Sequence, residues 1–175
     1  MKNSLLLLLL FSFSFTACKL DDGAVIDDTP DPDENITVVT NLDNALILKL
    51  VNDKRTVGCN CGTVAMPPVP AVTWNNLLAK AAATHSADMN TNKFLDHVST
   101  SNGKGTVDRV NATGYKWKLL AENLASGQID EVAVVNAWIN SVEHCKNIMT
   151  ANLKEMGVAK NGIYWTQKFG TKIDK

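Results

Sequence analysis

The chain has 175 residues, 45% of them hydrophobic, and its 17 basic residues nearly balance 18 acidic ones, giving a formal net charge of −1. The absence of a block of Lys and Arg excludes a typical nucleic-acid partner. After the N-terminal segment, no apolar stretch approaches the roughly 20 residues of a transmembrane helix. The remaining length fits one domain with a single core.

The N-terminus predicts export. An apolar run from Leu5 to Phe15 follows a basic residue, and Thr16-Ala17 supply small residues for cleavage, so residues 1–17 are predicted to be a signal peptide. Cys18 follows as in a bacterial lipobox, although Phe15 stands where that motif usually has Leu. We therefore predict a lipid anchor at Cys18, which attaches the protein to the outer membrane or cell surface. Cleavage without lipidation, giving a periplasmic or secreted protein, is the alternative.

Residues 18–36 differ in composition from the rest of the chain. They are rich in acidic residues, contain Pro30 and Pro32, and have few large apolar side chains. Such a segment cannot bury enough surface to offset its ordering entropy. We predict an acidic, disordered tether after Cys18, with a leader of no consequence as the alternative, and a single domain over residues 37–175.

Helices are predicted from apolar residues at steps of three and four. The predicted helices run from Leu42 to Arg55, from Trp74-Asn75 to Met89, from Thr106 to Thr113, from Asp130 through Trp138, and from Ser141 to Met149. Thr106 and Asp130 are expected N-caps, and Gly114 is expected to end the third helix. His85 falls on the apolar side of the second helix, which favours a core histidine over a metal-ligand pair with Asp88.

Strands are predicted at residues 119–125, 156–160 and 163–169. Asn161-Gly162 between the last two is a typical two-residue hairpin turn. Long helical segments before and between the strands favour an α+β sandwich with a small antiparallel sheet over a parallel one.

Cysteine spacing predicts one disulfide. With Cys18 assigned to lipid, the domain keeps Cys59, Cys61 and Cys145, an odd number in a compartment that permits disulfides. Cys59 and Cys61 are too close to pair without strain, so we expect Cys145 to pair with one of them and leave one free thiol. A zinc site formed by these three cysteines and His144 is the alternative.

Several segments, in this order along the chain, resemble the CAP superfamily (cysteine-rich secretory and pathogenesis-related proteins) in its bacterial SCP-like branch. They are Trp74-Asn75, His85 to Met89, Phe94 to His97, Ala121 to Ala125, Ala137-Trp138 to His144, Asn147 to Met149, and Tyr164 to Gln167. The resemblance implies a three-layer α-β-α sandwich around a small antiparallel sheet, with a cleft across one face.

The resemblance also implies site residues. Well-studied members hold two His and two Glu in the cleft, which can gather a divalent metal, and His97 and Glu122 match the first of each. Ser141 and Tyr164 stand where eukaryotic members place the second Glu and His. His144 occupies the position of a histidine characteristic of the bacterial branch. The candidate catalytic and metal-binding cluster is therefore His97, Glu122 and His144.

Two imidazoles and one carboxylate are a sufficient ligand set for a catalytic-type zinc, which would lower the pKa of a bound water to about 7. A divalent metal such as zinc is the one cofactor that these residues suggest. Asn123, Tyr164 and Gln167 are further candidates for ligand binding. The structural alternative is a satisfied polar network that orients the strand and loops around the cleft.

We expect an exported, monomeric lipoprotein whose cleft binds a lipid, a glycan or a divalent metal. A metal-dependent hydrolase or protease of the envelope is one alternative. A non-catalytic structural or host-interaction protein is the other.

Overall fold

The computed structural model describes residues 36–173. The predicted signal peptide, Cys18 and the tether up to residue 35 lie outside the described residues. Within the described range, no helix combines the length and the apolar character that crossing a membrane requires.

The main sheet has four strands in the order β3-β5-β6-β4, so β4 is an edge strand. Its strands are β3 (Thr73–Trp74), β4 (Trp117–Ser126), β5 (Glu155–Asn161) and β6 (Tyr164–Lys172). The pairs β4–β6 and β5–β6 are antiparallel, as predicted, whereas the short β3 adds a parallel pair with β5. A separate hairpin of β1 (Cys59–Cys61) and β2 (Val64–Met66) lies in a segment for which no strand was predicted.

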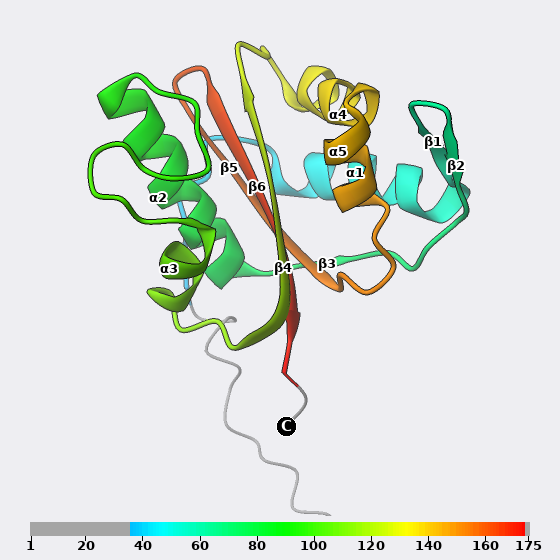
Figure 1. Ribbon diagram of the computed structural model, residues 1–175, viewed down its shortest axis with the longest axis horizontal. Coiled ribbons are helices and arrows are strands. Elements are labelled where there is room, and N and C mark those ends of the chain that lie inside the picture. The colour runs from blue at the N-terminus through cyan, green and yellow to red at the C-terminus, as the bar shows by residue number, and fades with distance from the viewer. Residues whose placement is uncertain (1–35, 174–175) are drawn as a thin grey trace, which may run out of the picture. The chain divides into compact units, whose positions relative to one another are not determined.

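Helices cover both faces of this sheet, which confirms the predicted α+β sandwich. On one side lie α2 (Asn76–Asn92) and α3 (Thr106–Asn111) (Figure 1). On the other side lie α1 (Asn44–Val57), α4 (Glu131–Asn140) and α5 (Val142–Ile148). Successive side chains of a strand point to opposite faces, so each strand contributes to both helical layers.

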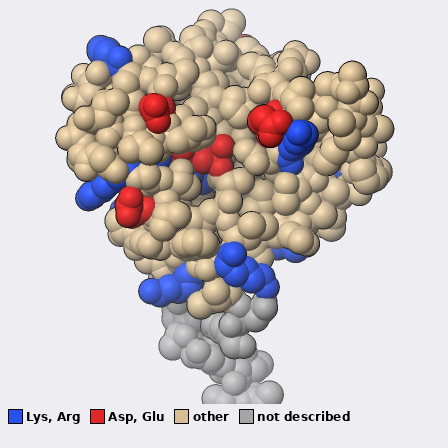
Figure 2. Space-filling model, viewed as in Figure 1, with Lys and Arg blue, Asp and Glu red and all other residues tan. Residues whose placement is uncertain are grey.

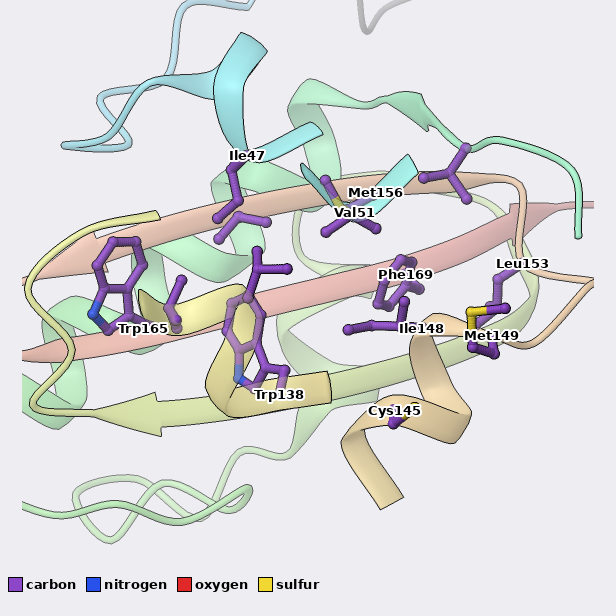
Figure 3. Packing of buried hydrophobic residues seen from close by; sticks show 14 of the residues in the cluster. Ile47, Val51, Trp138, Cys145, Ile148, Met149, Leu153, Met156, Trp165 and Phe169 are labelled. Atoms are coloured by element: carbon purple, nitrogen blue, oxygen red, sulfur yellow. The ribbon is translucent and has the colours of Figure 1, made fainter. Parts of the chain in front are cut away.

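The larger hydrophobic core lies between the sheet and the layer of α1, α4 and α5. Trp138 from α4 packs near Trp165 and Phe169 from β6, and all three side chains are buried (Figure 3). On the opposite face, α2 approaches β5 closely. A Cβ atom added at Gly157 would lie 2.1 Å from the backbone nitrogen of Ala79, so only glycine fits this position.

Arg55 is a buried cation near the end of α1, with 0% of its surface exposed. Its guanidinium donates to the carbonyl oxygens of Pro70, Thr150 and Leu153 at 2.8, 3.1 and 3.1 Å, and also to that of Ile148. One side chain therefore holds the loop before β3 and the connection between α5 and β5 against α1. Buried donors of this kind are costly to leave unpaired.

The predicted helix starts at Asn75 and Asp130 are confirmed, since each side chain accepts a backbone N–H from the first turn. The prediction for Thr106 is wrong. Gly105 is the N-cap of α3, and its N–H donates to the Asp108 side chain at 2.9 Å, which leaves Thr106 as the first helical residue. The helix also ends at Asn111, earlier than the predicted residue 113.

The turn between β5 and β6 is shifted by one residue from the predicted Asn161-Gly162. Asn161 pairs with Tyr164 in the ladder, so Gly162 and Ile163 form the turn. Gly162 has a φ of +56°, in the left-handed region that favours glycine. Asn161 stays in the strand while its side chain accepts from Asn90 Nδ2 at 2.8 Å, a contact with α2 that the local pattern does not reveal.

Candidate functional site

The carboxylate of Glu122 is the centre of a buried polar cluster. Glu122 lies in β4 opposite Lys168 of β6, and only 3% of its side chain is exposed. Its Oε1 accepts from His97 Nδ1 at 2.6 Å, and its Oε2 accepts from Arg109 Nη2 at 3.1 Å and from Lys168 Nζ. Both oxygens of the carboxylate are therefore occupied by donors from three different parts of the chain.

Arg109 and Lys168 are partners that the sequence analysis missed. Arg109, in α3, also donates to the carbonyl oxygens of Lys104 and His97 at 2.7 and 2.8 Å, so it ties down the loop that carries His97. Lys168 is completely buried, and its Nζ also lies 3.3 Å from Thr106 Oγ1. Strand alternation was the available signal for Lys168, because a lysine inside an apolar strand needs a buried counter-charge.

Electrostatics keep Glu122 ionised. Burial raises the pKa of Glu122, but the hydrogen bond from His97 and the charges of Lys168 and Arg109 outweigh it and hold this pKa far below its usual range. Burial also lowers the pKa of Lys168 to about 8, with Glu122 opposing that effect. At neutral pH the buried cations Arg109 and Lys168 thus face the single carboxylate of Glu122. The cluster therefore carries a net positive charge even when His97 is neutral.

His97 is the member of the cluster that reaches solvent, with 57% of its side chain exposed. Its hydrogen bond to Glu122 raises the pKa of His97, while burial opposes the rise. Because the ionised carboxylate only accepts, Nδ1 of His97 carries the proton, and Nε2 is left for a ligand. Figure 2 shows a hollow in the middle of the face in view, with acidic and basic side chains inside it.

His144 lies on α5, on the other side of the edge strand. It is half-buried, and the pKa of His144 is lowered mainly by this burial and to a smaller extent by the charge of His97. In the described part of the chain, Cys59, Cys61 and Cys145 are the one set of three or more metal-type side chains whose ligand atoms lie within 4.8 Å of one another. His97 and Glu122 are in contact, but the ligand atoms of His97, Glu122 and His144 do not all three lie within that distance of one another.

The donor set does not fit a metal bound directly by Glu122. A divalent cation at its oxygens would meet the charges of Arg109 and Lys168, each already in contact with that carboxylate. Like charges held together in a buried site repel strongly. A metal at this site would have to rely on the two imidazoles, without the carboxylate that completes a typical catalytic zinc site.

Asn123 and Gln167 lie on the opposite face of the sheet from Glu122. Asn123 Nδ2 donates to Gln167 Oε1 at 2.9 Å and to the carbonyl oxygen of His144 at 3.1 Å, and Asn147 Nδ2 donates to Asn123 Oδ1 at 2.8 Å. Asn123 and Gln167 are fully buried. These amides therefore hold α5, and with it His144, against the sheet.

Tyr164 lies on the same face of the sheet as Glu122 but belongs to a small apolar cluster. It packs with Met89, Leu124 and Phe94, and 9% of its surface is exposed. The structure thus brings His97 together with Glu122, with His144 nearby. Asn123 and Gln167 point to the other face of the sheet, and Tyr164 belongs to the apolar cluster, so these three candidates do not join them.

The structure confirms two further predictions. Cys61 and Cys145 form the disulfide, and Cys59 is a free cysteine. The four-ligand zinc alternative does not fit this arrangement, because two of its sulfurs are bonded to each other. His85 is fully buried, and its Nε2 bonds the carbonyl oxygen of Asp96 at 2.9 Å, so it is a core histidine.

A family model of the cysteine-rich secretory protein family, CAP, matches residues 48–169. Among curated proteins, the chain is similar to the uncharacterized protein YkwD of Bacillus subtilis, with 38% identity over 94 residues. It is also similar to the uncharacterized membrane protein YlbC of the same organism, with 32% identity over 96 residues. These matches cover 53% and 55% of this chain but 36% and 28% of the relatives, so the chain spans about a third of their length.

Solved structures show the same fold. An extracellular protein containing a SCP domain from Bacillus anthracis is 32% identical with a TM-score of 0.57, over 59% of this chain and 35% of that one. An outer surface protein from Borrelia burgdorferi is 20% identical with a TM-score of 0.64, over 78% of this chain and 97% of that one. The second likeness concerns the fold alone.

Proposed function

Because this chain belongs to the cysteine-rich secretory protein (CAP) family, we propose that it is a ligand-binding protein of the cell exterior. A lipid on Cys18 anchors it, and its cleft binds an anionic group of the ligand, a carboxylate or a phosphate, through His97. The export signals at the N-terminus support this location, as does the extracellular relative from Bacillus anthracis.

The observation that carries the proposal is the pairing of an exposed imidazole with a buried carboxylate. His97 Nδ1 lies 2.6 Å from Glu122 Oε1, with 57% of the first side chain and 3% of the second exposed. The bond fixes the orientation of the imidazole and raises the pKa of His97, so this side chain presents a donor with partial positive charge to solvent. Arg109 and Lys168 keep the local potential positive, which favours an anionic ligand over a divalent metal. Phospholipids and acidic glycans carry such groups.

Hydrolysis is the second candidate, and one observation favours it. A buried carboxylate that orients an imidazole at Nδ1 and leaves Nε2 exposed is the arrangement of the base in many hydrolases. Glu122 itself cannot serve as the base, because its pKa is held far below neutrality. His97 would therefore have to activate a water molecule.

The test combines binding and turnover on the full mature protein. Inorganic phosphate and vesicles of an anionic phospholipid are titrated into wild type, His97→Ala and Glu122→Gln, and binding is followed by isothermal titration calorimetry for phosphate and by sedimentation for the vesicles. The proposal expects binding by wild type that weakens at least several-fold in both variants. Unchanged binding in both variants, or none in wild type, would refute it.

Two controls complete the design. Lys146→Ala removes an exposed cation of α5 that pairs with Glu143, and it should bind like wild type if the cluster at His97 is responsible. A panel of peptide and ester substrates is tested in parallel, and turnover that disappears in His97→Ala would favour hydrolysis over binding.

For the anchor, metabolic labelling with a fatty acid should be lost in Cys18→Ser.

A further inference from the structure

The sulfur atoms of Cys59, Cys61 and Cys145 lie within 4.8 Å of one another where the β1–β2 hairpin packs on α5. Cys59 and Cys61 are two residues apart in β1, so both side chains lie on the same face of that strand. Cys61 is bonded to Cys145, and the Sγ of Cys59 lies 3.7 Å from the Sγ of the same Cys145. The free thiol is thus in contact with a sulfur of the disulfide.

The surroundings of Cys59 differ from those of Cys61. Cys59 lines a cavity of about 350 Å³ together with Leu50, Lys54 and Val57 of α1 and Val135 of α4, and it is half-buried. Cys61 is fully buried. A small reagent can therefore reach the sulfur of Cys59 through the cavity, whereas the sulfur of Cys61 is shielded by the fold.

We propose that these sulfurs form an intramolecular thiol–disulfide exchange site, in which Cys145 pairs with either Cys61 or Cys59. The Cys59 thiol gives its proton to solvent, and the thiolate attacks Cys145 Sγ. The bond between Cys59 and Cys145 forms while the bond between Cys61 and Cys145 breaks, and Cys61 leaves as a thiolate that takes a proton from solvent. Nothing is oxidised or reduced overall, so the exchange requires no external redox partner.

The exchange moves the free thiol between two environments. With Cys61 bonded, the free thiol of Cys59 faces the cavity, where small-molecule disulfides of the exterior can reach it. With Cys59 bonded, the free thiol of Cys61 lies inside the core and is protected from them. Both bonded forms tie β1 to α5, so the fold keeps its cross-link in either state.

The experiment uses the full mature protein, purified without reductant. The protein is incubated at mildly alkaline pH, which provides thiolate, and is then quenched with acid. It is labelled with N-ethylmaleimide in denaturant and digested under non-reducing conditions for mass spectrometry. The proposal expects the label on Cys61 to rise with time to a plateau while the label on Cys59 falls, with Cys145 unlabelled throughout. A label that stays on Cys59 alone would overturn it.

Two variants make the result specific. Cys59→Ser cannot exchange, so the N-ethylmaleimide label on its Cys61 should stay at background. A rise of the Cys61 label in this variant equal to that in wild type would refute the intramolecular route. Cys61→Ser keeps Cys59 and Cys145 as the two cysteines of the domain, and it should close the alternative disulfide between them and show no free thiol in the domain. Two free thiols in that variant after folding under oxidising conditions would also overturn the proposal.

Discussion

Glu122→Gln removes the one negative charge of the buried cluster while keeping its shape. Arg109 and Lys168 would then remain buried without a counter-charge, since both contact this carboxylate and 3% and 0% of their side chains are exposed. Removing one partner of a buried ion pair costs about 3–5 kcal/mol. We expect a loss in the free energy of unfolding within that range in mildly acidic solution.

Lys168 makes this loss depend on pH. Burial already lowers its pKa to about 8, and without Glu122, which raises that pKa, the amine can shed its proton near neutrality. In the variant, the folded pKa of Lys168 lies further below its unfolded value of 10.5. The unfolded state then binds more protons than the folded state, so the stability of the variant rises with pH through this window. The difference in the free energy of unfolding between Glu122→Gln and wild type should therefore decrease from mildly acidic to mildly alkaline solution.

The assay is urea unfolding followed by tryptophan fluorescence, because Trp138 and Trp165 are buried in the core. Glu143→Gln is the matched control, since this carboxylate is 79% exposed and pairs with Lys146 three residues away, and it should change stability by less than about 0.5 kcal/mol. A Glu122→Gln variant as stable as the control would refute the electrostatic account of the cluster.

Three further predictions concern the framework around the site. Arg55→Met should lower the free energy of unfolding by roughly 3 kcal/mol, because four carbonyl contacts are lost, and urea unfolding measures it. Gly157→Ala should cost at least about 2 kcal/mol, because its Cβ would clash with the backbone of Ala79; thermal unfolding as wild type would contradict this. Burial lowers the pKa of His85 to about 4, so between pH 7 and 5 this residue takes up a proton in the unfolded state but not in the folded state. The free energy of unfolding should therefore fall by roughly 2 kcal/mol over this pH range because of His85. The pH dependence should be weaker in His85→Gln, and an unchanged slope would contradict the assignment.

Local signals predicted much of the fold. Asn75 and Asp130 mark helix starts because a cap acts on the backbone of its own first turn. The prediction of Thr106 as an N-cap was wrong because Asp108, two residues further on, accepts the N–H of Gly105 and makes that glycine the cap. The turn at Gly162 was displaced because Asn161 bonds α2, a contact between segments far apart in the sequence.

The candidate site was predicted only in part, for a similar reason. Resemblance to a known family led to His97 and Glu122, which the structure joins by a hydrogen bond. Arg109 and Lys168 come from α3 and β6, and their meeting at Glu122 depends on strand register, which sequence patterns do not specify. Strand alternation alone, however, indicates that Asn123 faces away from Glu122, since neighbours in a strand point to opposite faces.

Glu122 is proposed above to orient His97 as a donor for an anionic ligand. The most direct measurement is the NMR spectrum of the His97 ring, with inorganic phosphate or zinc added in separate titrations. We predict a proton on Nδ1 whose resonance shifts strongly in Glu122→Gln, and a change in the Nε2 resonance when phosphate is added to wild type. An unprotonated Nδ1, together with stoichiometric zinc binding that is lost in Glu122→Gln, would contradict it.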